Sequence, residues 1–171
     1  RNTDGTSTAE ISPSPLNFRA GDGSWRAIDS SVISDPAQPG GMRNRANDWT
    51  VHFGSTGQGV VMDTGAGSVG MSPIAARTVA PIGSGQHVTY ADAWPGADLT
   101  YTVTPTGVKE SILIKGRAAG ARFGFAIRTG DANQVLSGRG ADSTALTLAT
   151  DGSVQFVGRL GTEVSLAAPV V

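Results

Sequence analysis

The chain has no cysteine, little charge and few aromatic residues, and each shortage excludes a class of protein. Without cysteine among its 171 residues, it has no disulfide, no thiol nucleophile and no cysteine-ligated metal. Charged residues make up 16% of the chain and the formal net charge is −1, so no electrostatic field gathers nucleic acid or an anionic membrane. No apolar run approaches the ~18 residues of a membrane-spanning helix. The sequence therefore predicts neither nucleic-acid binding nor membrane insertion.

Glycine is abundant instead, at 24 residues, and apolar residues alternate with polar ones. Leu99, Tyr101 and Val103 are separated by threonines, which is the period of two expected of a half-buried strand. Turn signals such as Asp22-Gly23 and Pro105-Thr106-Gly107 divide the chain into about eleven to thirteen short strands. Helical periodicity is almost absent.

These patterns predict an all-β fold, an antiparallel β-sandwich of two sheets with little or no helix. We expect long glycine-rich loops at Asp35–Gly41 and Gly54–Gly70. No linker divides the chain, so residues 1–171 are predicted to form a single module. Because the chain starts at Arg1 without methionine and ends on the apolar segment before Val171, we expect it to be a fragment of a longer protein.

Asp92, Asp98 and Glu110 are the candidates for carboxylate chemistry, beside Tyr90 and Tyr101. Two carboxylates among aromatic rings can hydrolyse a glycosidic bond if one is kept protonated. Asp92 and Asp98, however, flank a Trp-Pro-Gly loop, where acidic side chains bond backbone amides. Glu110 is in phase with the apolar residues of its strand, so it is predicted to face inward and to need an Arg, Lys or backbone N–H partner. We therefore expect three structural anchors and no catalytic residue.

The two histidines, His52 and His87, lie in segments that alternate as strands, and neither has the spacing of a zinc site. A Ser/His/Asp triad needs its members to meet only in space, but no GxSxG motif is present. We expect ordinary strand histidines. An enzyme fragment that combines a histidine with one of the three carboxylates is the third-ranked alternative.

Two further patterns bear on cofactors and metals. Gly65–Gly70 reads GAGSVG, but the following segment contains Pro73 and Pro81 in place of the helix that a dinucleotide site needs. Aspartates near glycine, such as Asp4 and Asp151, do not follow the spacing of a calcium-binding loop. We predict no cofactor and no metal site. A loop calcium ion stays open on composition alone, and turn formation is the simpler use of these aspartates.

Trp25, Trp49 and Trp94 are the candidates for ligand binding. Exposed and coplanar, they would form a surface on which sugar rings stack. In a β-sandwich, tryptophans more often fill the core or its ends. The tryptophans thus support glycan binding only as an alternative.

Two segments resemble a known group of proteins. Gly21–Val32 contains DGSWRAID, and Val88–Lys115 reads VTYADAWPGADLTYTVTPTGVKESILIK. Together they resemble a recurrent β-rich region of large secreted proteins from Gram-positive bacteria, of the RHS/YD-repeat, polymorphic-toxin or wall-associated type. The closing segment Gly152–Val171 is similar to the later part of that region.

The resemblance implies a non-catalytic structural or assembly module of a secreted or cell-surface protein, whose partners are other domains of the same polypeptide. In RHS-type proteins the repeats build a shell around a C-terminal toxin, and preceding β domains cap or support that shell. No catalytic residue comes with the resemblance. The alternative is a carbohydrate-binding β-sandwich that holds a cell-wall or surface glycan.

Overall fold

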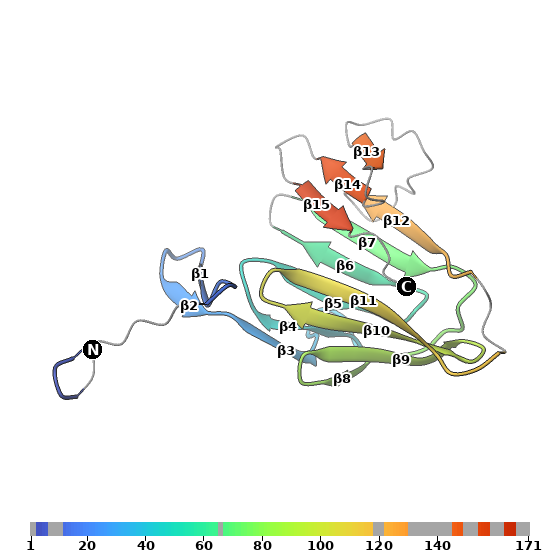
Figure 1. Ribbon diagram of the computed structural model, residues 1–171, viewed down its shortest axis with the longest axis horizontal. Coiled ribbons are helices and arrows are strands. Elements are labelled where there is room, and N and C mark those ends of the chain that lie inside the picture. The colour runs from blue at the N-terminus through green and yellow to red at the C-terminus, as the bar shows by residue number, and fades with distance from the viewer. Residues whose placement is uncertain are drawn as a thin grey trace.

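The computed structural model describes residues 3–6, 12–64, 67–117 and 122–129, together with three strands at 145–148, 154–157 and 163–166. In this part of the chain every regular element is a strand (Figure 1). The predicted all-β class is therefore confirmed. No helix that could cross a membrane is present in these residues.

Fifteen strands are described, which is more than the turn signals predict. In chain order they are β1 (Asn17–Arg19), β2 (Trp25–Ala27), β3 (Asp29–Ser34), β4 (Met42–Ala46), β5 (Thr50–Phe53), β6 (Val60–Asp63), β7 (Ser68–Pro73), β8 (Ile82–Ser84), β9 (His87–Trp94), β10 (Ala97–Thr104), β11 (Gly107–Ile114), β12 (Phe125–Thr129), β13 (Ala145–Leu148), β14 (Val154–Val157) and β15 (Glu163–Leu166).

Two antiparallel sheets account for most of the strands. One has the order β11-β10-β9-β8 and the other the order β12-β7-β6-β5-β4-β3. In Figure 1 the green and yellow four-stranded sheet lies over β3, β4 and β5 of the six-stranded sheet. The two sheets form the predicted sandwich. Strands β1 and β2 form a separate ribbon, and β13, β14 and β15 form a separate three-stranded sheet.

Strand β10 shows how the sequence pattern becomes the core. Ala97, Leu99, Tyr101 and Val103 are buried, whereas the residues between them are half-buried on the other face of the sheet. The strand is hydrogen-bonded to β9 on one side and to β11 on the other. Because β10 has a neighbouring strand on each side, its side chains alternate without interruption between the packed face and the half-buried face of the sheet.

Aromatic side chains from both sheets meet in this core. The ring centroids of Phe53 and Tyr101 are 5.7 Å apart, and those of Tyr90 and Tyr101 are 6.1 Å apart in an edge-on arrangement. The Tyr90 hydroxyl donates a hydrogen bond of 2.8 Å to the Gly54 carbonyl oxygen, so its polar end is satisfied inside the molecule. These contacts join β5 of one sheet to β9 and β10 of the other.

The glycine-rich middle differs from the expectation. Residues 35–41 do form the connection between β3 and β4, but the predicted loop Gly54–Gly70 contains β6 and the start of β7. Gly59 has a φ of +81°, and a Cβ atom there would collide with the Met71 carbonyl oxygen. Glycine is thus needed where two strands approach closely, and its abundance does not by itself predict a loop.

Candidate functional site

The three tryptophans lie in different environments. Trp49 and Trp94 are buried, and the Trp94 indole donates a hydrogen bond of 3.0 Å to the Ile74 carbonyl oxygen. Trp25, at the start of β2, is 72% exposed. The structure therefore presents no surface made of all three indoles, and a glycan that stacks on tryptophan would have to use Trp25.

Asp92 and Asp98 meet where β9 ends and β10 begins. Asp92 has a φ of 50°, and the pairing of β9 with β10 is irregular at this point. The Asp98 carboxylate accepts a hydrogen bond of 2.6 Å from the backbone N–H of Asp92. This contact holds the distorted end of β9 in place, as an acidic side chain beside a turn is expected to do.

Lys115 completes this cluster from the end of β11. Its ammonium group lies 2.6 Å from the Asp92 carboxylate and 2.8 Å from that of Asp98. The hydrogen bond from Lys115 and that from the Asp92 amide hold the pKa of Asp98 below its ordinary value. Bonds to both carboxylates raise the pKa of Lys115 in turn. The cluster is partly exposed and therefore contributes less to stability than to the geometry of the strand ends.

Glu110 lies apart from the other two carboxylates. It stands opposite the buried Tyr101 in the β10–β11 register, whereas Asp98 stands opposite the exposed Leu113. Positions 110 and 113 differ by an odd number of residues, so they face opposite sides of the sheet. A glycosidase pair that combines Glu110 with Asp92 or Asp98 is not brought together.

The surroundings of Glu110 are apolar. Burial raises its pKa to about 7, and the neighbouring Tyr101 hydroxyl offsets only part of that rise. Neither Oε2 of Glu110 nor the Tyr101 hydroxyl makes a hydrogen bond of ordinary geometry within the described residues. The Arg, Lys or backbone partner that the sequence leads one to expect for Oε2 is thus not found there.

The structure reveals a pair that the sequence does not predict, between His52 and Asp35. Nδ1 of His52 lies 2.6 Å from the Asp35 carboxylate, whose side chain is only 1% exposed. Burial by itself would raise the pKa of Asp35, but hydrogen bonds from His52 and from the Ala37 amide hold it below the ordinary value. The only sequence signal is that Asp35-Pro36 follows an alternating segment.

A carboxylate that orients a histidine forms two members of a hydrolytic triad, so the third member decides what the pair can do. The register partners of His52 are Arg43 on β4 and Val61 on β6, and neither is a nucleophile. His87, the other histidine, is exposed, and its Nδ1 lies 3.0 Å from the Thr102 hydroxyl. The two histidines therefore sit on strands, as predicted, and the pair at His52 joins β5 to the segment after β3.

Two buried polar residues that sequence reasoning missed also join segments. The Asn44 side chain donates a hydrogen bond to the Trp49 carbonyl oxygen and accepts one from the Val51 amide. The Thr56 hydroxyl donates to the Arg77 carbonyl oxygen and accepts from the Val79 amide. Each of these side chains satisfies backbone groups that strand pairing leaves over.

The sequence patterns considered for a metal or a dinucleotide form turns and strands in the described residues. No group of three His, Asp or Glu side chains in the described ranges is arranged to hold a metal ion. Asp4 accepts hydrogen bonds from Thr6 within a turn. Asp151 lies outside the described residues, as does part of the GAGSVG motif. The rest of that motif, from Ser68, begins strand β7 and not a helix.

No family model, curated protein or solved structure matches this chain. The polar side chains described above mostly contact backbone groups or each other across strand ends. The exposed Trp25 is not part of the core formed by the described residues.

Proposed function

We propose that this chain is a non-catalytic structural or assembly module of a large secreted or surface protein of bacteria, of the RHS/YD-repeat, polymorphic-toxin or wall-associated type. The resemblance of Gly21–Val32 and Val88–Lys115 to such proteins supplies the biological context. The observation that carries the non-catalytic part is the separation of Glu110 from Asp92 and Asp98. A hydrolase of the glycosidase type needs two carboxyl groups on either side of one bond.

The contacts of two of the predicted anchors, Asp92 and Asp98, support this proposal, and so does the Asp35–His52 pair, which the sequence does not predict. Asp98 and Lys115 hold the ends of β9, β10 and β11 together, and Asp35 receives bonds from His52 and Ala37. In each case the polar side chain stabilises the path of the backbone. A module whose polar groups are used in this way presents a rigid scaffold to its neighbours, which here are other domains of the same polypeptide.

The proposal is tested by comparing activity and stability in the same variants. Wild-type protein, Glu110→Gln and His52→Gln are incubated with panels of glycans and peptides, and their thermal unfolding is recorded. We expect no turnover from any of them, and a changed midpoint for unfolding in the variants. A hydrolytic turnover of the wild type that one of these substitutions abolishes would contradict the proposal.

The assembly part needs a separate measurement on the natural protein. Cross-linking of the secreted full-length polypeptide, followed by mass spectrometry of its peptides, is expected to join this module to other domains of the same chain. Cross-links that stay within the module would count against the assembly role, although the activity result would be unaffected.

Glycan binding is the second candidate, and the exposure of Trp25 favours it. Insoluble cell-wall preparations are expected to retain the wild-type protein and to release Trp25→Ala if a sugar stacks on this indole. Equal retention of both proteins, or of neither, excludes Trp25 as a glycan contact.

A further inference from the structure

Strand β11 forms an open edge of the four-stranded sheet (Figure 1). It is eight residues long, and its register with β10 runs from Gly107 to Ile114 without a shift. Its outer side pairs with no other described strand. Proteins usually protect such an edge with a short strand, a bulge or a covering segment, because a regular free edge accepts a further strand.

The opposite side of the sandwich shows this protection. Strand β8, the other edge of the same sheet, has only three residues. Strand β3, an edge of the six-stranded sheet, has a register shift between Asp29 and Val32. The Val32 amide also donates a hydrogen bond of 2.7 Å to the carbonyl oxygen of Gly85, in the turn between β8 and β9. Among the described edges of the two sheets, β11 is therefore the longest regular one.

The backbone groups of β11 alternate between β10 and the free edge. The Lys115 amide donates a hydrogen bond of 2.8 Å to the Gly96 carbonyl oxygen, on the side of β10. In steps of two residues, the amides of Leu113, Ser111 and Lys109 point the same way. The amides that point outward are those of Val108, Glu110, Ile112 and Ile114.

The side chains of these four residues lie on the core-facing side of the sheet, because their register partners on β10 are buried. Val108 and Ile112 are only partly buried there, and Ile114 is 58% exposed. Glu110 lies between Val108 and Ile112, and its Oε2 is buried without a hydrogen-bond partner. Tyr101 is its neighbour on β10, so the next place in this row belongs to a strand added at the edge. A basic residue at that place would supply the missing donor.

The described edges of a second copy do not offer such a strand. Strands β3 and β8 contain no lysine or arginine. In β11, Lys109 alternates with Glu110 and therefore lies on the other face. In β12, Arg128 shares its face with Ala126 and not with the larger apolar residues of the strand. A basic residue flanked by large apolar residues on one face must come from a different segment.

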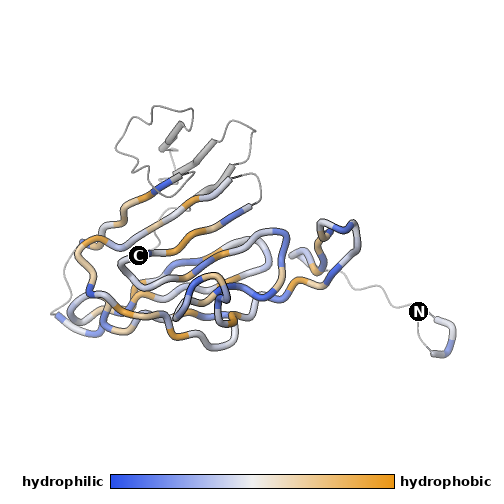
Figure 2. The backbone as a smooth tube through the Cα atoms, turned by 180° about the vertical axis from the view of Figure 1, so that it is seen from behind, coloured by the Kyte–Doolittle hydropathy of each residue, from blue (hydrophilic) through white to orange (hydrophobic). Residues whose placement is uncertain are grey.

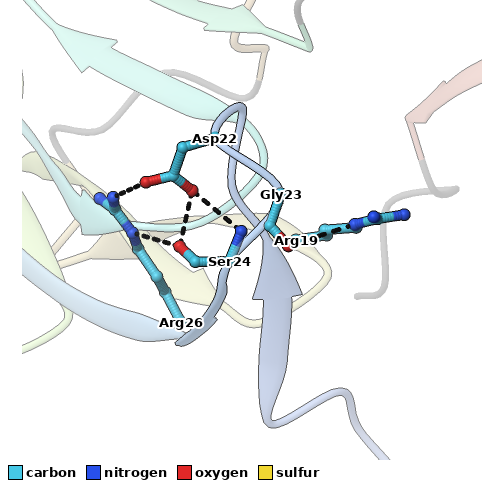
Figure 3. Close-up of polar contacts among 5 residues, drawn as sticks. All are labelled: Arg19, Asp22, Gly23, Ser24 and Arg26. Carbon is cyan, nitrogen blue, oxygen red and sulfur yellow. Dashed lines mark hydrogen bonds and ion pairs between the residues drawn. The ribbon is translucent and has the colours of Figure 1, made fainter.

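The β1–β2 ribbon, which stands clear of the two sheets in Figures 1 and 2, makes no comparable demand. The Asp22 carboxylate at its turn accepts bonds from the Ser24 amide at 2.9 Å and from Arg26 at 2.7 Å (Figure 3). The polar groups of this turn thus satisfy each other, whereas Oε2 of Glu110 needs a donor from outside.

We propose that an extended segment of another domain of the same polypeptide adds to the outer edge of β11, with a lysine or arginine opposite Glu110 and large apolar residues two positions away on either side. Its backbone bonds the outward groups of β11, its basic side chain donates to the Glu110 carboxylate, and its apolar residues cover Val108 and Ile112. This inference rests on the proposed assembly function and names the contact through which that function acts.

The test uses the synthetic peptide acetyl-Ser-Val-Thr-Lys-Thr-Ile-Ser-amide, titrated into isotope-labelled protein up to millimolar concentration, since one short strand binds weakly. Nuclear magnetic resonance follows each backbone amide. The amides of Glu110 and Ile112 are expected to shift and to exchange more slowly with solvent. Those of Lys109 and Ser111, which already face β10, are expected to change little.

Matched peptides separate strand addition from general stickiness. Norleucine in place of the lysine keeps the apolar stem without the charge and is expected to bind about tenfold more weakly. In Glu110→Gln, whose amide spectrum shows whether it is folded, the two peptides are expected to bind almost alike. Methyl groups on the backbone nitrogens of the peptide's valine and isoleucine block pairing and are expected to abolish binding.

The full-length polypeptide gives an independent measurement. Lys109 and Lys115 are the only lysines of this chain, and both lie in or next to β11. An amine-reactive cross-linker applied to the secreted protein is therefore expected to join Lys109 to a segment of another domain.

Several results would overturn the inference. An unchanged spectrum at millimolar peptide excludes the edge, and equal binding of the methylated peptide excludes strand pairing. Equal binding of the lysine and norleucine peptides by the wild type excludes the contact to Glu110. Cross-links from other residues to other domains, without peptide binding, would retain the assembly function and exclude β11 as its site.

Discussion

The β10–β11 hairpin and the β1–β2 ribbon are both antiparallel pairs closed by short turns, but different forces hold them. In β10 every second side chain is buried against the other sheet. In the ribbon only Phe18 is partly buried, and the turn residues hold each other through Asp22. The comparison teaches that a buried apolar face supplies the stability of a strand pair, whereas turn chemistry supplies its shape.

The largest expected effect comes from truncating a core ring and the exposed indole in parallel. Phe53 is fully buried, so Phe53→Ala is expected to lower the free energy of unfolding by about 3–5 kcal/mol. Trp25→Ala is expected to change it by less than about 0.5 kcal/mol. Urea unfolding followed by circular dichroism measures both. Similar losses in the two variants would show that the ribbon is part of the cooperative core.

The next comparison is between a glycine with atoms packed close to it and a glycine in open space. Gly59→Ala places a Cβ against Met71 and Ser72 at a left-handed φ, whereas Gly57 has open space around it. We expect Gly59→Ala to cost about 2 kcal/mol or more and Gly57→Ala to be close to neutral. The same urea titration measures both changes. A neutral Gly59→Ala would mean that β6 and β7 approach less closely than described.

The buried carboxyl of Glu110 predicts a dependence of stability on pH. Its folded-state pKa is raised from 4.5 to about 7, so its contribution is present below pH 4.5 and is lost as the pH rises through about 7. We expect the free energy of unfolding to fall by about 2 kcal/mol between pH 5 and pH 8. Glu110→Gln is expected to remove this fall and to exceed the wild type in stability at pH 8. Parallel slopes for the two proteins would refute the assignment.

The smallest effect is expected at the ribbon turn. Hydrogen bonds from the Ser24 hydroxyl and amide, together with Arg26, lower the pKa of Asp22 to about 2, so the turn persists until the pH falls through that value. Asp22→Ala is expected to speed hydrogen exchange of the Ser24 amide without moving the global unfolding midpoint. Asp4→Ala, which removes a similar turn outside the ribbon, is the control. An unchanged exchange rate at Ser24 would show that the turn does not depend on Asp22.

Local patterns predicted much of the fold. The alternation of Leu99, Tyr101 and Val103, the turn at Pro105–Gly107 and the inward phase of Glu110 all appear in the structure. Such features depend on residues within a few positions of each other. The strands inside Gly54–Gly70 were missed because glycine permits a close strand approach as readily as a loop.

Local sequence patterns did not predict contacts between residues that are far apart in the chain. Strand β4 lies between Asp35 and His52 in the sequence, and no local pattern in either segment predicts that the two side chains meet. Whether Trp25, Trp49 or Trp94 is buried depends equally on which strands are covered.

The sequence by itself determined the all-β class, the position of several turns and the face to which β10 turns its apolar residues, because periodicity and turn chemistry are local. Only the tertiary structure decided which polar groups meet and which tryptophan stays exposed. It also decided that Glu110 lies beside Tyr101 and apart from Asp92 and Asp98. Those outcomes follow from how two sheets pack, and packing joins residues that are distant along the chain.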